Sequence, residues 1–144
     1  MCQQDLSRGS IKWPERYKQL ISYEGLERHR HITPTDIDGM IDYNGNAFLY
    51  FECKHGGKYN EEGLDYGQKR ALENIINSHI KANKISMVIV FIHYCAANEI
   101  IMAKEQSVVE IYWQGRWSKT DPFWNVLDAI NWFENYCKNK EISI

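Results

Sequence analysis

The sequence predicts a mixed α/β domain in which helices cover both faces of a central sheet. The run at residues 85–92 is β-branched and almost entirely apolar, which is typical of a strand that is buried on both faces. Residues 64 to about 81 instead place apolar side chains at helical spacing, at Leu72, Ile75 and Ile76. Because strand-like and helix-like segments alternate along the chain, a layered α/β domain is the expected class.

The segment before residue 34 predicts one helix. Pro14 followed by Glu15 is typical of a helix start, because proline suits the first turn and an acid suits the positive end of the helix dipole. Gly25 is expected to end this helix. Whether residues 29–33 form a further strand is left open. The apolar face of the helix would consist of Tyr17, Leu20 and Ile21.

Two strand-like runs follow Pro34, a residue that favours an extended backbone before it. The first run lies around residues 37–41 and the second at residues 48–53. Asn44 and Gly45 lie between them, and both residue types tolerate positive φ. The pattern therefore predicts a β-hairpin.

The connections in the rest of the chain are less regular. Residues 55–63 are rich in glycine and polar side chains, which predicts a loop. Residues 108–113 have the composition of a strand. Gln114 and Gly115 then predict a turn that leads into Trp117.

A last amphipathic helix is expected after Asp121 and Pro122, which resemble a helix cap. The predicted order is helix, strand, strand, helix, strand, strand, helix. The apolar positions of the last helix are Val126, Ile130, Phe133 and Cys137.

Size and composition fit one domain covering residues 1–144. The chain is 44% hydrophobic and 25% charged, and its formal net charge is −2. These values are ordinary for a globular protein and exclude a strongly basic nucleic-acid binder, so any basic surface must be local. One group of cations precedes the acidic motifs and either faces a phosphate backbone or is simply solvated: Arg8, Lys12, Arg16, Lys18, Arg28 and Arg30.

The four cysteines do not have metal-binding spacing. Cys2, Cys53, Cys95 and Cys137 form no CxxC pair and no zinc-finger pattern with histidine. Cys53 and Cys137 fall within a strand pattern and a helix pattern, and we interpret them as small buried side chains in a reducing compartment. The N-terminus lacks an apolar signal region, and the longest apolar run is too short to cross a bilayer. We therefore expect a cytoplasmic protein without a membrane partner.

The candidate chemistry lies on the predicted hairpin. Side chains alternate along a strand, so Glu52 and Lys54 share one face while Phe51 and Cys53 share the other. The hairpin would bring Asp38, at the start of the first strand, next to the end of the second strand. Two carboxylates and one ammonium group would then meet at one place.

Such a site suits hydrolysis of a phosphodiester bond. Two carboxylates bind Mg²⁺ or Mn²⁺ while leaving positions for water and phosphate oxygens. The metal lowers the pKa of a bound water and offsets the charge that develops at phosphorus. Lys54 would orient that water or neutralise the developing charge.

On these residues the chain resembles the PD-(D/E)xK nuclease superfamily, whose fold is called restriction-endonuclease-like. The matching features are Asp38 before an apolar strand, a hairpin, and Glu52-Cys53-Lys54 as the E-x-K element. Gln68 matches a glutamine that some members carry on the following helix. The resemblance covers residues 14 to 93 and is greatest to the small phage and resolvase-like nucleases.

The resemblance implies an αβββαβ core, with the aromatic-rich C-terminal strand and helix as an extension outside it. It implies Asp38 and Glu52 as ligands of Mg²⁺ or Mn²⁺, and the backbone carbonyl of Cys53 as a further ligand. It also implies catalytic roles for Lys54 and Gln68. The expected activity is that of a DNA endonuclease, and many small members of the superfamily are homodimers.

The sequence departs from the family pattern at the first acid. Pro34 and Asp36 are separated by Thr35, and Asp38 follows two residues later, so either aspartate could be the family's acid. We favour Asp38 as the main ligand, because it directly precedes the apolar strand, with Asp36 as a second ligand or a support. For the extra acid that some members carry on the first helix, we prefer Glu24 over the neighbouring glutamates.

Two alternatives stay open at this point. The C-terminal aromatic residues either stack on unpaired bases, form a dimer contact, or make a second layer of core, and we favour the last. The chain as a whole is either an active nuclease, with DNA a more plausible partner than RNA, or an inactive module of the same fold that binds DNA or a protein. The aromatic residues concerned are Tyr112, Trp113, Trp117, Phe123, Trp124, Trp132, Phe133 and Tyr136.

Overall fold

The computed structural model describes residues 21–28, 30, 32–121 and 123–144. The chain divides into two compact units, Met1–Pro34 and Thr35–Ile144. The prediction of one domain over residues 1–144 stays a prediction.

In the first unit, the described residues show a turn closed by a hydrogen bond from the Leu26 N–H to the Tyr23 carbonyl. Residues 21–25 are not helical, so the predicted helix that would end at Gly25 is wrong there. Gly25 has a φ of 80° and serves the turn instead. The earlier part of that helix and most of the cationic group lie outside the described residues.

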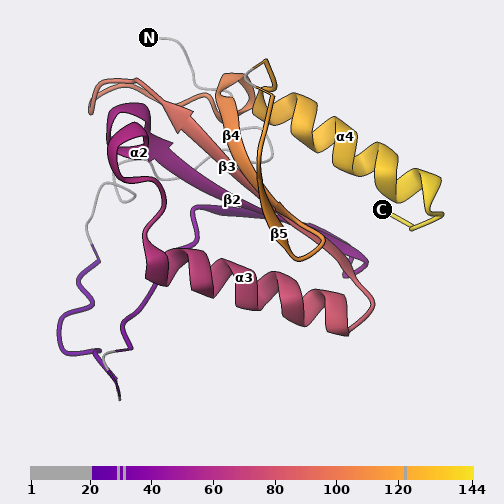
Figure 1. Cartoon of the computed structure of the whole chain (residues 1–144), viewed down its shortest axis with the longest axis horizontal. Helices are drawn as coiled ribbons and strands as arrows, with labels where there is room; N and C mark the ends of the chain where they lie inside the picture. The colour runs from indigo at the N-terminus through magenta and orange to yellow at the C-terminus, as the bar shows by residue number, and fades with distance from the viewer. Residues whose placement is uncertain (1–20, 29, 31, 122) are drawn as a thin grey trace, which may run out of the picture. The chain divides into compact units, whose positions relative to one another are not determined.

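The second unit is built on one five-stranded mixed sheet (Figure 1). The strands lie in the sheet in chain order, and only β2 and β3 are parallel, whereas every other pair is antiparallel. In the described part of this unit, three α-helices accompany the sheet, two of them between β2 and β3. The strands are β1 (Gly39–Tyr43), β2 (Ala47–His55), β3 (Ile85–His93), β4 (Ser107–Trp113) and β5 (Arg116–Lys119), and the helices are α2 (Gly56–Glu62), α3 (Tyr66–Lys81) and α4 (Val126–Asn139).

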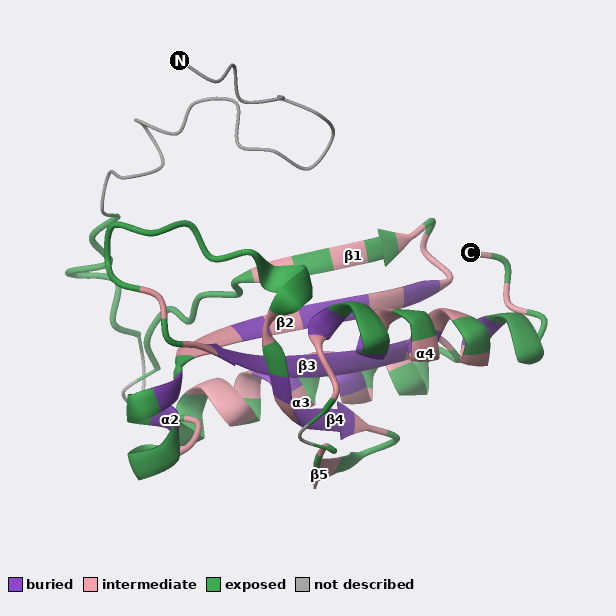
Figure 2. Cartoon of the chain, turned by 90° about the horizontal axis from the view of Figure 1, so that it is seen from above, coloured by how far each residue is buried: buried purple, intermediate pink, exposed green. Residues whose placement is uncertain are grey.

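Helices cover both faces of the sheet, as the sequence predicts. Figure 2 shows the buried segments of β2, β3 and β4 between α3 and α4. Strand alternation directs Leu49, Met87 and Ile89 towards α4, and Tyr50 and Val88 towards α3. The second unit is therefore a mixed α/β fold with two apolar layers.

The predicted hairpin is confirmed. Asn44 and Gly45 both have positive φ, at 55° and 75°, and the Asp42 carboxylate accepts a hydrogen bond of 2.6 Å from the Gly45 N–H. The hairpin pairs Gly39 with Phe51, so continuing this register by one residue places position 38 opposite position 52.

Residues 55–63 were expected to form a loop, but most of them form α2. Gly56 and Gly57 favour a helix poorly, so local sequence signals miss it. The helix is stabilised by the His55 side chain, which accepts a hydrogen bond from the Gly57 N–H, and by burial of Tyr59. The helix that follows begins at Tyr66 rather than at residue 64, because Asp65 caps its first turn.

Two further expectations need correction near the C-terminus. The turn at Gln114 and Gly115 joins β4 to a fifth strand, β5, that was not predicted. The last helix is capped by a reciprocal pair of hydrogen bonds between Asn125 and Asp128, and not by Asp121, whereas Pro122 lies outside the described residues.

The expected αβββαβ core is matched only in part. Within the described residues of Thr35–Ile144, two strands rather than three precede the helices and the parallel strand β3. Among the described residues of the first unit, an isolated antiparallel bridge pairs Arg28 with Ile32, at the region 29–33 that was left open. Across the described residues, no helix has the length and apolar run needed to cross a bilayer.

Candidate active site

Glu52 is the buried centre of the candidate site. It points from β2 towards α3, and only 1% of its surface is exposed. Its Oε1 atom accepts a hydrogen bond of 2.6 Å from Nε2 of Gln68 and lies 2.8 Å from Nζ of Lys54. Burial raises the pKa of Glu52, and the charge of Asp38 raises it further, although Lys54 and Gln68 act in the opposite direction.

The second oxygen of Glu52 has no partner. Oε2 is buried and makes no hydrogen bond with the described part of the chain. A buried oxygen of a carboxylate normally has a donor or a cation beside it, because leaving it alone costs its desolvation energy. A cation bound at Oε2 would therefore supply the partner that this buried oxygen lacks.

Asp38 lies beside Glu52 at the open end of the hairpin. Its Oδ2 atom accepts a hydrogen bond of 2.8 Å from the Cys53 N–H. The carboxylate is exposed, and Oδ1 accepts no hydrogen bond from the residues that the structure describes. Asp38 is thus held in place by one oxygen while the other is available for a ligand.

The Cys53 backbone is oriented towards the same place. In an antiparallel pair, the N–H and C=O of one residue face the same neighbour, so the Cys53 carbonyl is directed to the side of Asp38. The β1–β2 ladder ends at Gly39 and Phe51, which leaves this carbonyl beyond the paired region. Burial and nearby carboxylates raise the pKa of the Cys53 thiol to about 11, so the thiol stays protonated at neutral pH.

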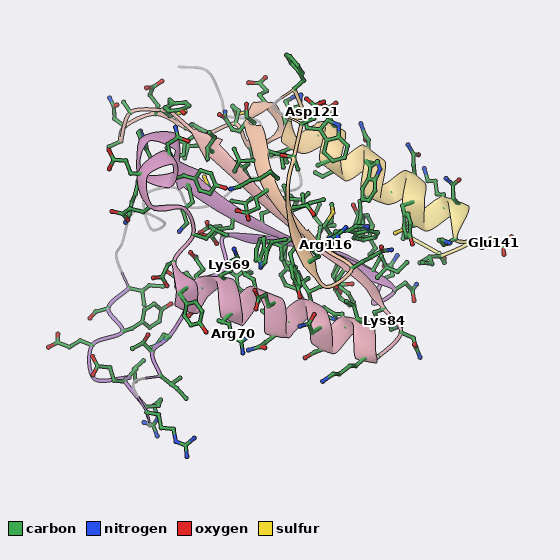
Figure 3. All side chains as sticks on the ribbon, viewed as in Figure 1. Lys69, Arg70, Lys84, Arg116, Asp121 and Glu141 are labelled. Atoms are coloured by element: carbon green, nitrogen blue, oxygen red, sulfur yellow. The ribbon has the colours of Figure 1, made fainter. Side chains whose placement is uncertain are left out.

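Gln68 reaches Glu52 because α3 starts at the right position. The Asp65 side chain accepts a hydrogen bond of 3.2 Å from the Gln68 N–H and fixes the first turn. Lys69 and Arg70 occupy the same end of the helix, whereas Lys84 lies beyond its opposite end (Figure 3). Arg70 pairs with Glu73 one turn further along α3.

Of the other predicted acids, Asp36 is not joined to this group by a contact within the described chain, and Glu24 is not placed relative to it. Asp36 is exposed, and no hydrogen bond or ion pair joins it to Glu52, Lys54 or Gln68 in the described chain. Glu24 belongs to the first unit, whose placement against the second is not determined. The structure therefore brings together Asp38, Glu52, Lys54 and Gln68, but not Asp36.

A second charged cluster was missed from the sequence. Glu110 of β4 is 7% exposed and accepts a hydrogen bond of 2.9 Å from the Tyr59 hydroxyl. Lys119 of β5 donates to the same hydroxyl at 2.6 Å and lies 3.5 Å from Glu110, and Lys69 of α3 lies 3.8 Å from Glu110. The available signal was a single acid inside the apolar run 108–113.

Glu110 and Glu52 lie on one row across the sheet. Each is paired in register with Val90, from opposite sides of β3. Two strand spacings separate their backbones by about 10 Å. The second cluster therefore lies next to the site without being part of it.

The residues of the site fit a hard divalent cation. Among the described residues, no group of three or more histidine, cysteine, aspartate or glutamate side chains is placed to hold a metal. Mg²⁺ does not require such a group, since one or two carboxylates, a carbonyl and several waters complete its octahedral shell. The oxygens that such an ion would use are Oδ1 of Asp38, the Cys53 carbonyl and Oε2 of Glu52, which makes no hydrogen bond with the described residues.

Comparison of the chain with models of protein families, with curated proteins and with solved structures finds no match. A functional assignment therefore depends on the geometry of the site itself.

Proposed function

We propose that this protein is a metal-dependent nuclease that hydrolyses phosphodiester bonds in DNA. The observation that supports this best is the buried carboxylate of Glu52. It lies beside Asp38, Lys54 and Gln68 and keeps one oxygen without a partner among the residues that the structure describes. A structural ion pair would gain nothing from such an oxygen, whereas a metal ligand requires one.

Each residue would have a distinct role. Asp38, Glu52 and the Cys53 carbonyl would hold Mg²⁺ or Mn²⁺, which when bound acidifies a water molecule and offsets negative charge on the phosphate. Lys54 would donate hydrogen bonds to the attacking water or to a phosphate oxygen. Gln68 would keep the Glu52 carboxylate in one orientation through its bond to Oε1.

The finer classification is also part of the proposal. A hairpin that carries the acids, followed by helices and a parallel strand, is compatible with the restriction-endonuclease-like fold. Asp36 would assist from outside the metal shell. We further propose a cytoplasmic protein that acts as a homodimer, in which two identical sites would serve two strands.

A nuclease panel tests the activity. Single-stranded, duplex, forked and four-way DNA are incubated with Mg²⁺ or Mn²⁺, and with EDTA. We expect cutting that EDTA abolishes, because the water needs the metal to become a nucleophile near neutral pH. Cutting that persists in EDTA would contradict the metal mechanism.

Lys54→Ala is expected to lower the cleavage rate by about 10²-fold, because it removes one charge that stabilises the transition state. Lys81→Ala is the matched control, since Lys81 is an exposed lysine at the end of α3. Rates of the two variants are compared on the best substrate of the panel. Equal rates would remove Lys54 from the mechanism.

Metal binding can be measured without any substrate. At tenfold excess over its dissociation constant, Mn²⁺ would stabilise the protein by about 1.4 kcal/mol, which raises Tm by roughly 4 °C for a chain of this size. We expect Asp38→Asn to lose this shift and Glu61→Gln, an exposed acid of α2, to keep it. A shift of the same size in both variants would place the metal elsewhere.

One observation favours a second function, that of an inactive module which binds DNA or a protein. Lys54 and Gln68 both occupy Oε1 of Glu52, and the carboxylate is closed off from solvent. In that case the cluster would be a structural ion pair. DNA binding without cutting in Mg²⁺, Mn²⁺ and Ca²⁺, together with no Mn²⁺-dependent rise in Tm, would favour this function over the nuclease.

A further inference from the structure

A cavity of about 310 Å³ adjoins the candidate active site. Lys54 forms part of its wall, so the cavity and the site share one residue. The other walls come from α2 and from the connection between α2 and α3, including Lys58, Tyr59, Glu62 and Tyr66. A ligand bound at Lys54 can therefore extend into this cavity.

The chemistry of the lining suits one nucleotide. Lys58 makes no salt bridge with the described residues, so its charge is available for a phosphate. Tyr66 lines the cavity and is 77% exposed, so an unpaired base could stack on its ring. The carboxylate of Glu62 can accept hydrogen bonds from amino groups on the edge of a base.

The cavity has a wall that is fixed before any ligand binds. Tyr59 is buried, and its hydroxyl lies between Glu110 and Lys119, at 2.9 Å and 2.6 Å. The ammonium group of Lys119 also lies 4.9 Å from the centre of the Tyr59 ring. These contacts connect α2 to β4 and β5 and hold the wall of the cavity in place. The proposed cleavage reaction assigns no role to Glu110 and Lys119, whereas a binding cavity does.

We propose that this cavity binds a single unpaired nucleotide next to the scissile phosphate, so that the enzyme prefers single-stranded DNA to intact duplex. A base that remains paired and stacked cannot enter a cavity of this size, whereas an unpaired base can be turned out to meet Tyr66. The inference rests on the proposed nuclease function, because it assigns the substrate class of that site.

The test compares cleavage of one sequence as a single strand and as a duplex, with Mg²⁺ present. We expect faster cutting of the single strand. Tyr66→Ala should reduce the ratio of single-strand to duplex rates about tenfold, which is the size of one lost base–aromatic stack. Lys58→Ala should also reduce this ratio, because it removes the charge that would hold the phosphate of the nucleotide in the cavity. Glu61→Gln, an exposed residue of α2 that does not line the cavity, should leave the ratio unchanged.

A second measurement separates the cavity from catalysis. Binding of a fluorescent single-stranded oligonucleotide is followed by anisotropy in EDTA, using Asp38→Asn as background, and Tyr66→Ala should weaken it about tenfold. If DNA is cut but Tyr66→Ala and Lys58→Ala keep the wild-type ratio of single-strand to duplex rates, the cavity assignment fails and the proposed nuclease function stands. If no DNA is cut and the Tyr66→Ala variant still binds more weakly, the nuclease fails and the nucleotide site stands.

Discussion

Replacing Glu52 with glutamine is expected to abolish cleavage and, at the same time, to stabilise the protein. The activity should fall by at least about 10³-fold, because glutamine keeps the shape of the side chain but removes the negative charge that would hold the metal. The hydrogen bond from Gln68 can still be made to an amide oxygen in place of Oε1. The loss would therefore report on the charge rather than on the packing.

The gain in stability follows from burial. The carboxylate of Glu52 is only 1% exposed, so it has lost its hydration. Its ion pair with Lys54 and its hydrogen bond from Gln68 are both made by the same oxygen, Oε1. Removing the charge should raise the free energy of unfolding by on the order of 1 kcal/mol at neutral pH. Lys54 is 26% exposed, so its ammonium group can turn to solvent when its partner is neutral.

The gain should depend on pH with a defined sign. Because the pKa of Glu52 is raised by folding, the folded state binds a proton more tightly than the unfolded state. The free energy of unfolding of the wild type therefore falls as pH rises from 4.5, the pKa of Glu52 in the unfolded chain, through its higher pKa in the folded chain. Above the folded pKa the loss of stability is complete. The Glu52→Gln variant lacks this fall, so the two proteins should converge at pH 4 and separate at pH 7.5.

Urea unfolding at the two pH values measures this difference, and Glu61→Gln provides the control for loss of an exposed carboxylate. If Glu52→Gln were destabilising at pH 7.5 and inactive, the inactivity would be a consequence of unfolding. If it were stabilising and fully active, Glu52 would have no part in the chemistry.

The candidate site was predictable because its signals are local. The alternation around Glu52 and Lys54 and the turn at Asn44 and Gly45 lie within one hairpin, where sequence spacing determines which side chains meet. Gln68 needed only the correct start of α3, which the Asp65 cap provides. Short-range sequence patterns were therefore enough to predict which of these side chains lie close together.

The features that were missed depend on contacts between distant segments. The helix α2 begins with two glycines and exists because Tyr59 is buried against residues about fifty positions later. Strand β5 pairs with β4, and its Trp117 donates a hydrogen bond to Glu73 of α3. Local propensity contains no information about such partners, so a loop and a turn were expected in their place.

The C-terminal segment shows the same limit on a larger scale. It was expected to be an extension outside the nuclease core, although a second layer of core was the favoured role for its aromatic residues. In the structure, α4 provides the cover for one face of the sheet and buries Val126, Ala129, Phe133 and Cys137. The segment is therefore part of the fold that carries the site, and its contribution to the free energy of unfolding can be measured.

Phe133→Ala is expected to lower the free energy of unfolding by about 3–5 kcal/mol. The ring is completely buried, with its centre 5.9 Å from that of Tyr43 on β1 and 6.1 Å from that of Trp113 on β4. Alanine would leave a cavity between α4 and the sheet, which the surrounding residues can refill only in part. Urea unfolding at neutral pH measures the loss.

Phe123→Ala is the matched control, because Phe123 is 90% exposed and the same atoms are removed from the same segment of the chain. Its free energy of unfolding should change by less than about 0.5 kcal/mol. Since α4 packs on the face of β2 that carries Leu49 and Cys53, loosening it also loosens the strand whose other face presents Glu52. Phe133→Ala should therefore lose cleavage at a lower urea concentration than the wild type, whereas loss of cleavage at the same urea concentration would show that the site does not need this packing of α4.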